Sequence, residues 1–283
     1  VSVYASLEFM DVQKFDIIVI GGGHAGCEAA VAAATLGCRT AMVTLQKSRI
    51  GFMSCNPAIG GLAKGQLVKE IDALGGIMAI HADRAAIQYR QLNSSKGAAV
   101  RSTRVQCDKA KYAEEMQATI RTVSGLTVIE DEGIDLKWSV DPNGRRVTGV
   151  LLARGGWVET TAVVITAGTF LKAVMFTGFA KSDGGRHGDR AAGLMSQAIE
   201  AAGIKLKRLK TGTPPRLRLS SISLDKTEKQ PGDKDPKPFS FRTRKEPFPI
   251  LPQIDCYITH TNEETHRIIE SNFDQSPMFT GLI

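Results

Sequence analysis

Two kinds of residue in this sequence could do chemistry: closely spaced glycines near the amino terminus and five scattered cysteines. Gly21, Gly23 and Gly26 give the spacing GxGxxG within the segment GGGHAG. In that pattern the first glycine permits a tight turn, the second lets the backbone approach a pyrophosphate, and the third lets a helix pack closely on a strand. The cysteines form no CxxC pair, so we expect neither a disulfide framework nor a structural zinc site, and a reducing compartment fits best.

The segments on either side of the glycines predict a β-α-β unit. A short apolar strand is expected at 15–20, a helix of small residues at 27–36 and a second strand at 40–45. Phosphates would then sit at the amino terminus of the helix, where N–H groups and the helix dipole favour anions. The predicted dinucleotide contacts are Gly21, Gly22, Gly23, His24, Ala25 and Gly26. The acid that usually ends the second strand is absent; Thr44 and Gln46 stand there, so ribose recognition must take another form.

A later run of strands indicates which dinucleotide binds. Strands are expected at 126–130, 136–140, 147–153 and 158–167, and helices at 62–74, 108–123 and 189–202. The strands from residue 136 onwards predict a three-stranded β-meander before a buried final strand, AVVITAG. This order resembles the second flavin signature of two-dinucleotide-domain flavoproteins. The resemblance favours FAD over NAD and makes Gly133 and Gly168 two further candidate backbone contacts.

The predicted fold class is α/β, with an FAD-binding Rossmann-like domain of the two-dinucleotide-domain flavoprotein type that contains a β-meander. We expect this domain at 14–204 and the start of an inserted, incomplete second α/β domain at 205–283. The boundary is expected where periodic sequence gives way to basic, proline-containing sequence.

Composition matches that of an ordinary globular protein. The 283 residues are 42% hydrophobic and 23% charged with a net charge of +7, which excludes disorder, coiled coil and collagen-like repeats. No apolar run approaches the ~20 residues that cross a bilayer. The amino terminus lacks the basic-then-apolar layout of an export signal, so we expect a cytoplasmic protein that is not membrane-bound.

Positive charge is concentrated between residues 205 and 249, where thirteen Lys and Arg face five Asp and Glu, a net +8. Such a segment is typical of a polyanion-binding surface, with a solvated lysine-rich loop as an equal alternative. Within it, Lys210, Thr211, Thr213 and Arg216 of KTGTPPR could bind a phosphate or an anionic folate tail, or form a solvated turn. The histidines show no metal-ligand spacing, so we expect no metal site; His260 and His266 are expected in polar substrate-side or surface positions.

Five longer segments carry a resemblance to a known family. They are SCNPAIGG (54–61), LVKEIDALGG (67–76), NSSKGAAVRSTRVQ (93–106), LKTGTPPR (209–216) and CYITHTNEETH (256–266). They resemble the MnmG (GidA) flavoproteins of tRNA wobble-uridine modification. The resemblance implies a homodimeric enzyme that works with the GTPase MnmE on tRNA. It further implies FAD, NADH as the reductant and methylene-tetrahydrofolate as the one-carbon donor, with ammonium or glycine as the amine donor left open.

The reaction on C5 of uridine needs a nucleophile, because C5 becomes reactive when a thiolate adds at C6. Cys55 is the candidate that the resemblance selects, in a loop expected to lead into a helix whose N–H groups could lower a thiol pKa. A structural role is the alternative for a loop cysteine, and Cys27 and Cys38 are expected in the core. The resemblance also implies a flavin-side serine where Ala192 stands, which puts that contact in doubt.

The resemblance implies a second catalytic cysteine and an NADH loop beyond Ile283, so we expect this sequence to be an amino-terminal portion that is inactive alone. Two other functions remain open from the sequence. One is a folate- and FAD-dependent tRNA uracil methyltransferase, which the segments 54–61 and 256–266 disfavour. The other is a non-catalytic flavin-binding RNA adaptor.

Overall fold

The computed structural model describes residues 13–142, 144–185, 192–212, 214–244 and 247–282. Its contacts divide the chain into two compact units, described here separately. The first unit comprises the described parts of 1–48, 120–173 and 191–206; the second comprises those of 49–119, 174–190 and 207–283. The domain division expected at 204 stays a prediction; the contact units group 49–119 and the described part of 174–190 with residues after 206.

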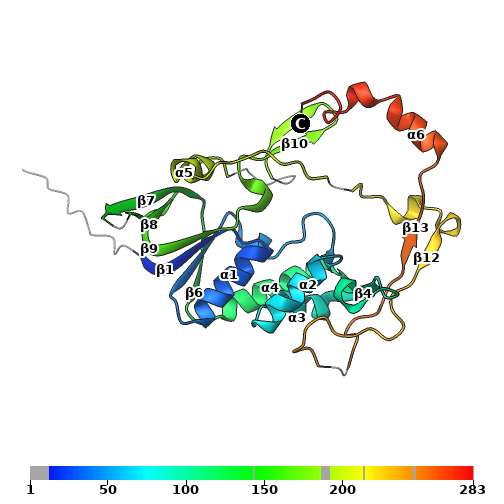
Figure 1. Cartoon of the computed structure of the whole chain (residues 1–283), viewed down its shortest axis with the longest axis horizontal. Coiled ribbons are helices and arrows are strands. Elements are labelled where there is room, and N and C mark those ends of the chain that lie inside the picture. Colours follow the sequence, from blue (N-terminus) through cyan, green and yellow to red (C-terminus); the bar gives the residue numbers. More distant parts are fainter. Residues whose placement is uncertain (1–12, 143, 186–191, 213, 245–246, 283) are drawn as a thin grey trace, which may run out of the picture. The chain divides into compact units, whose positions relative to one another are not determined.

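The first unit is built on a six-stranded sheet with the order β6-β2-β1-β9-β8-β7 (Figure 1). Its strands are β1 (Lys14–Ile20), β2 (Thr40–Thr44), β6 (Leu126–Glu130), β7 (Gly133–Asp141), β8 (Gly144–Leu152) and β9 (Gly156–Ile165). The four strands β6, β2, β1 and β9 run parallel, while β9, β8 and β7 are joined as antiparallel neighbours. The mixed sheet with a parallel core confirms the predicted α/β Rossmann-like fold.

Helices cover this sheet because its central strands are apolar on both faces. Alternate residues Ile18 and Ile20 of β1 pack with Met195 and Ile199 of α5 (Met195–Ala201) in one buried cluster. The small residues of α1 (His24–Thr35) contact β1, β2, β6 and β9, and Figure 1 shows α1 and α5 on opposite sides of the sheet. Small side chains let α1 approach the strands closely, as the sequence predicted.

The meander differs from the sequence prediction in one respect. Its third strand and the expected final strand AVVITAG are one continuous strand, β9. Residues 156–159 of β9 pair antiparallel with β8, and residues 159–165 pair in parallel with β1. A single strand can do both because each strand has two hydrogen-bonding edges. The expected helix at 189–202 is observed as the shorter α5; its predicted start at 189 lies outside the described residues.

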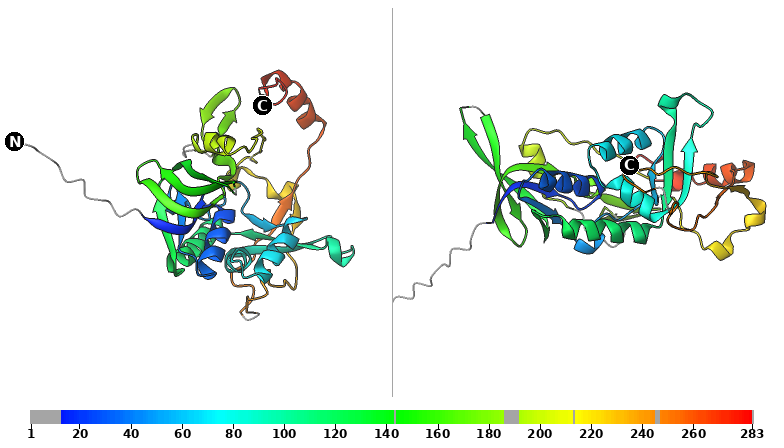
Figure 2. Two further views of the ribbon diagram at one scale, coloured as in Figure 1. Left: turned by 60° about the vertical axis from the view of Figure 1, so that its left-hand side comes forward. Right: turned by 90° about the horizontal axis from the view of Figure 1, so that it is seen from below.

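The second unit is centred on a three-stranded antiparallel sheet with the order β3-β5-β4 (Figure 2). Its strands are β3 (Ala58–Gly60), β4 (Ala86–Leu92) and β5 (Ser102–Cys107), and its helices α2 (Lys64–Ala73) and α3 (Met78–Ala85) contact each other and the sheet. Further elements are the paired strands β10 (Val174–Thr177) and β11 (Ala180–Asp183), the paired strands β12 (Glu228–Gln230) and β13 (Cys256–Ile258), and α6 (Glu263–Glu270). Helix α4 (Lys109–Thr122) begins in the second unit, and Asp108 caps it by accepting hydrogen bonds from the N–H groups of Ala110 and Lys111.

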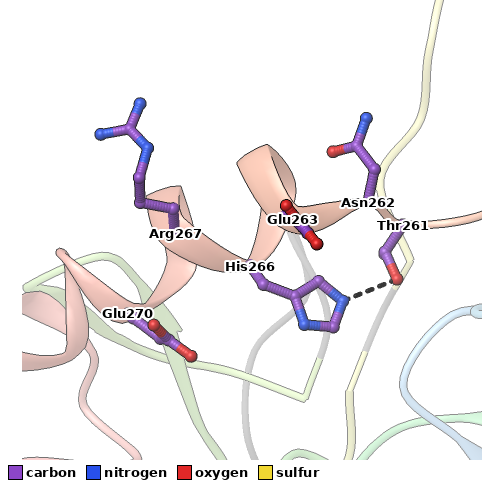
Figure 3. Close-up of a pocket in the computed structure, with 6 residues that line it drawn as sticks. All are labelled: Thr261, Asn262, Glu263, His266, Arg267 and Glu270. Carbon is purple, nitrogen blue, oxygen red and sulfur yellow. Dashed lines mark hydrogen bonds between the residues drawn. The ribbon is translucent and has the colours of Figure 1, made fainter.

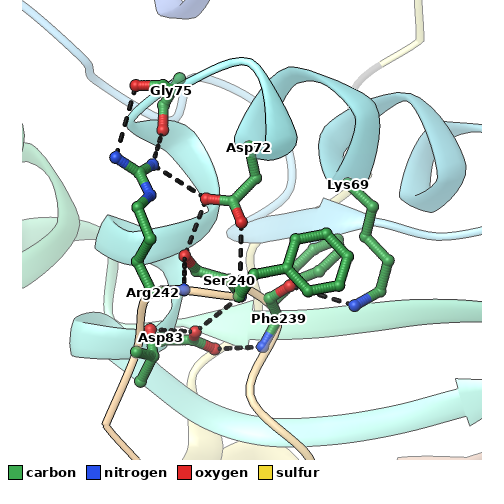
Figure 4. Close-up of polar contacts among 10 residues, drawn as sticks. Lys69, Asp72, Gly75, Asp83, Phe239, Ser240 and Arg242 are labelled. Atoms are coloured by element: carbon green, nitrogen blue, oxygen red, sulfur yellow. Dashed lines mark hydrogen bonds and ion pairs between the residues drawn. The ribbon is translucent and has the colours of Figure 1, made fainter.

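Two buried aspartates join the late part of the second unit to its early part (Figure 4). Asp83 of α3 accepts hydrogen bonds from the backbone N–H of Phe239 at 2.8 Å and of Ser240 at 2.9 Å. Asp72 of α2 accepts from the Ser240 hydroxyl and from the Phe241 N–H, each at 2.7 Å. The segment 239–243, which we call the docked segment, therefore belongs structurally with 49–119. Within the described residues, no helix is both long and apolar enough to span a membrane.

Candidate functional site

The glycine segment lies at the carboxyl ends of β1 and β9, two neighbouring parallel strands paired up to Ile20 and Ile165. The chain leaves β1 toward β2 and β6 on one side, and β9 occupies the other side. Ligands of open α/β sheets bind at such a switch in strand order. The structure therefore places 21–26 and Gly168 at the same edge of the sheet.

Two of the three fingerprint glycines are required by the protein itself. Gly21 has a φ of +113°, and a Cβ there would lie 2.6 Å from the Thr166 carbonyl oxygen. A Cβ on Gly26 would lie 1.8 Å from the Gly21 carbonyl oxygen. The turn is also tied to β9, because the Thr166 hydroxyl donates to the Ile20 carbonyl at 2.8 Å. These contacts leave no room for a side chain at either position.

Gly23 is different, because a Cβ there would meet no protein atom within 4 Å. It is exposed and forms the N-cap of α1; no side chain caps the helix and no acid stands in its first turn. The neighbouring His24 is half-buried, and burial lowers the pKa of its imidazole, so the ring is neutral near pH 7. Open space before an uncapped helix terminus fits a dinucleotide pyrophosphate, with residues 21–26 as its cradle.

The other predicted cofactor contacts lie on the first unit in different surroundings. Gly168 is exposed with a φ of +58° and opens a short turn after β9. Ala192 lies near it, since its backbone exchanges hydrogen bonds with Phe170 and Lys172. Gly133 is buried at the start of β7, where a Cβ would lie 3.1 Å from the tip of Ile20. Packing alone thus explains glycine at 133, and its contact with a cofactor stays a prediction.

The structure offers an acid near the ribose end that sequence reasoning missed. Thr44 ends β2, and its partner in the register across the sheet is Glu130, the last residue of β6. The Glu130 carboxylate accepts a hydrogen bond from the Lys47 N–H at 2.7 Å. A carboxylate therefore lies beside the end of the second strand, contributed by the neighbouring strand. Only the pairing of β6 with β2 could have revealed it.

In the second unit, Cys55 meets residues that the sequence singled out more than 150 positions later. The Cys55 thiol lies 3.6 Å from the Gly212 carbonyl oxygen. The Arg216 guanidinium donates a hydrogen bond to the Cys55 carbonyl. The half-exposed Cys55 thus contacts Gly212 through its thiol and Arg216 through its carbonyl. The local sequence gave no signal for this contact, although both segments belong to the blocks that carry the family resemblance.

The helix expected at 62–74 is confirmed as α2, which begins at Lys64. Strand β3 lies between this helix and Cys55, so the thiol does not directly precede the helix terminus. The positive group near Cys55 is Arg216. Among the other cysteines, Cys27 and Cys107 are buried, and burial is the main cause that raises the pKa of the Cys107 thiol to about 12.

Two of the remaining predicted substrate residues, Lys210 and Thr211, are exposed. Lys210 places its ammonium 3.1 Å from the Met278 sulfur, and Thr211 precedes Gly212 in the same exposed stretch. Thr213 lies outside the described residues. The structure therefore brings Arg216 and Gly212 to Cys55, and shows no contact of Lys210 or Thr211 with it.

The histidines of the segment 256–266 lie on the surface. His266 of α6 contacts the Thr261 hydroxyl at 2.9 Å beside a shallow hollow of about 420 Å³ (Figure 3). This hollow is formed by α6 and the residues just before it, and Arg267 pairs with Glu264 of the same helix. Across the described ranges, no group of His, Cys, Asp or Glu residues is arranged to hold a metal ion.

The parallel sheet, the switch in strand order and the glycine cradle define an α/β protein of the FAD-binding Rossmann-like class. The sequence profile described as "Glucose inhibited division protein A" matches residues 16–283. The chain therefore belongs to the GidA family.

Individual relatives agree with this assignment. Proteins named tRNA uridine 5-carboxymethylaminomethyl modification enzyme MnmG from Nitratiruptor sp. and Thermodesulfovibrio yellowstonii are each 47% identical over 271 residues, or 96% of this chain. The chain covers 43% and 42% of their lengths, so it spans less than half of these curated relatives. A crystal structure of Aquifex aeolicus GidA matches with a TM-score of 0.87 and 44% identity over 96% of this chain and 45% of that one.

Proposed function

We propose that this chain forms the FAD-binding and uridine-side part of an enzyme that installs a (carboxymethyl)aminomethyl group on C5 of the wobble uridine in tRNA. The main support is the identity of 47% across 271 residues to relatives named for this modification. The runner-up functions, a tRNA uracil methyltransferase and a flavin-binding adaptor, have no comparable support.

The residues of the first unit suit the cofactor role. Residues 21–26 would bind the FAD pyrophosphate at the start of α1, and Gly168 would let the chain pass close to the flavin. When bound, FAD would supply redox chemistry, with NADH as the reductant. The His24 imidazole is neutral, so the positive end of the helix dipole, and not this side chain, would attract the phosphates.

The residues of the second unit suit the nucleophilic role. The Cys55 thiolate would add to C6 of uracil, which opens the C5–C6 double bond and makes C5 enolate-like. C5 would then bond the methylene carbon of methylene-tetrahydrofolate as one of the two bonds from that carbon to folate nitrogen breaks. Loss of the C5 proton and departure of tetrahydrofolate would leave an exocyclic methylene on C5. The nitrogen of ammonium or glycine would add to this methylene and lose a proton, and departure of the thiolate would restore the C5–C6 double bond. Arg216, hydrogen-bonded to the Cys55 carbonyl, would fix the loop and place a positive charge beside the substrate.

The proposal includes the partners that go with this activity. They are tRNA, the GTPase MnmE and a second copy of the protein, in the cytoplasm. The exposed basic residues of 205–249 would contribute contacts to RNA phosphates.

The test uses a full-length protein that carries this sequence, in cells that lack their own copy of the gene. Cys55→Ser should retain FAD and tRNA binding and lose modified wobble uridine, measured by mass spectrometry of tRNA nucleosides. Serine cannot replace the thiol because its alkoxide is not accessible near neutral pH. Cys38→Ser is the matched control, since Cys38 is likewise half-exposed, and it should retain the modification. A Cys55→Ser enzyme that modifies tRNA at the normal rate would rule out the nucleophile.

A further inference from the structure

A second pocket in the second unit lies on the sheet formed by β4 and β5. Its volume is about 380 Å³. It is lined by Gln88, Arg90, Leu92, Arg104, Gln106 and Gln230. Neither Cys55 nor the glycine cradle contributes to it, so the functions described so far leave it unexplained.

Two arginines lie directly opposite each other in this pocket. Arg90 of β4 and Arg104 of β5 are register partners in the antiparallel pair. Like charges in that position repel and destabilise a sheet. Both residues are half-buried, which weakens the screening of this repulsion by water. An arrangement of this kind becomes favourable when an anion lies between the two guanidinium groups.

No acid of the described chain neutralises the pair. Neither Arg90 nor Arg104 forms an ion pair with a described carboxylate. Arg90 donates one hydrogen bond, to the Pro231 carbonyl at 3.0 Å, and keeps its other donors. The neighbouring Asp233 carboxylate accepts from the Gln91 N–H at 2.8 Å. Arg104 has its whole fork of donors available.

The rest of the lining suits a ligand larger than an inorganic ion. Pockets for small organic ligands begin at about 300 Å³, and this one exceeds that size. Gln88 is held in place, because its amide donates to the Gln230 carbonyl at 3.0 Å and accepts from the Cys256 thiol at 3.1 Å. The Gln106 and Gln230 side chains add amides that can donate and accept, as the edge of a nucleobase requires.

We propose that this pocket binds a nucleoside phosphate, with Arg90 and Arg104 on the phosphate and the glutamine amides on the base. Two facing guanidinium forks match the several oxygens of a phosphate better than the two oxygens of a carboxylate. The nucleotide is either one unit of an RNA chain or a free mononucleotide. Only the first source rests on the function proposed above.

The experiment compares two probes on a full-length protein that carries this sequence. Binding of 5′-UMP is measured by calorimetry, with uridine and inorganic phosphate as probes for each half of the ligand. Binding of an RNA stem-loop is measured by fluorescence anisotropy. The variants are Arg90→Gln and Arg104→Gln, and the control is Arg121→Gln, an exposed arginine at the end of α4 with the same loss of charge.

We expect either pocket variant to weaken the binding of at least one nucleotide probe tenfold or more, while Arg121→Gln changes it less than twofold. A loss for RNA identifies the source as the RNA chain, and a loss for UMP alone identifies a free nucleotide. The proposal is overturned if Arg90→Gln and Arg104→Gln behave like Arg121→Gln with both probes, or if inorganic phosphate binds as tightly as UMP.

The midpoint of thermal unfolding, measured without ligand, shows whether each variant is folded. Because Arg104→Gln removes a like-charge contact, its midpoint at low salt should equal or exceed that of the parent chain. Arg104→Lys retains the charge without the fork and should bind UMP or RNA with intermediate affinity. Loss of tRNA modification by Cys55→Ser does not depend on these variants, so failure of one proposal is distinguishable from failure of the other.

Discussion

Asp72 and Asp83 hold the same docked segment, yet their carboxyl groups respond differently to the fold. Burial is the main influence on Asp83, and it raises the pKa despite hydrogen bonds from Thr243, Phe239, Ser240 and Tyr89. Burial would also raise the pKa of Asp72, but hydrogen bonds from Arg242, Ser240 and Phe241 outweigh it and the pKa is lowered. The ion pair from Arg242 at 2.9 Å contributes to the difference, since Asp83 has no such partner in the described chain.

These opposite shifts predict opposite effects on acid stability. Because the pKa of Asp72 is lowered in the folded state, its carboxylate stabilises the fold at pH values above the unfolded pKa of about 3.9. This stabilisation is lost as the pH falls below that value and through the folded-state pKa. Asp83, with a raised pKa, stabilises the fold more as the pH falls toward and below its folded value. Urea unfolding between about pH 2 and 7 should therefore show a shallower acid loss below about pH 4 for Asp72→Asn and a steeper acid loss for Asp83→Asn.

The size of the effect at pH 7 follows from the contacts. Asp72→Asn removes a charge-assisted hydrogen bond and should cost about 1.5–3 kcal/mol. An exposed acid such as Asp274 is the control, and Asp274→Asn should change neither slope nor stability measurably. Equal pH slopes for the two buried variants would contradict the assigned shifts.

At the scale of elements, the turn between β1 and α1 contains glycines that are required for two different reasons, packing within the protein and space for the cofactor. Gly26→Ala should destabilise the fold by about 1–3 kcal/mol or more, because its Cβ would overlap the Gly21 carbonyl. Gly23→Val should leave the thermal midpoint of the ligand-free protein nearly unchanged, because its side chain points into open space. The same change should abolish FAD retention, measured by flavin absorbance after purification, since the valine would occupy the place of the pyrophosphate.

Gly37→Val provides a comparison, as Gly37 also has open space but lies at the far end of α1, where its φ of +90° makes a side chain costly. It should lower stability and leave FAD bound. If Gly23→Val retained stoichiometric FAD, the cradle would be wrongly assigned.

Elements that depend on local pattern were predictable, and those that depend on distant partners were not. The β1-α1-β2 unit follows from apolar runs, small residues and glycines within 30 residues of one another. Strand β3 has only three residues, and its pairing with β5 rests on a partner more than 40 positions away. The contact of Cys55 with Arg216 and the approach of Glu130 to Thr44 likewise arise from tertiary pairing, which no local spacing encodes.

At the scale of the whole chain, the basic region of 205–249 is partly neutralised by the fold. Lys229, Lys237 and Arg242 form ion pairs with Asp255, Asp235 and Asp72. Lys205 and Lys207 lie in an exposed stretch and have no ion pair with a described acid. These two lysines are therefore better placed than Arg242 to meet RNA phosphates.

The affinity of the chain for tRNA should fall as the salt concentration rises. The logarithm of the binding constant should fall with the logarithm of the salt concentration, with a slope of about 0.9 or less for each phosphate neutralised. Lys205→Glu combined with Lys207→Glu should flatten this slope. Filter binding between about 50 and 300 mM salt measures it, because such effects are large in this range. The control pair is Lys14→Glu with Arg121→Glu, two exposed cations of the first unit. An equal change of slope in both pairs would show that only the net charge of the chain matters.

The docked segment also sets the order in which the second unit can be completed during synthesis. The Ser240 hydroxyl reaches Asp72 across 168 positions of the chain, so at roughly 5–20 residues per second a ribosome needs about 8–34 s to supply it. Throughout that interval Asp72 lacks its donors from the docked segment, and Asp83 has only the Tyr89 hydroxyl among the donors that it has in the finished fold. They remain hydrated, and α2 and α3 cannot close over Phe239, which is fully buried in the end. A nascent chain stalled before residue 239 would therefore leave this core incomplete and open to solvent.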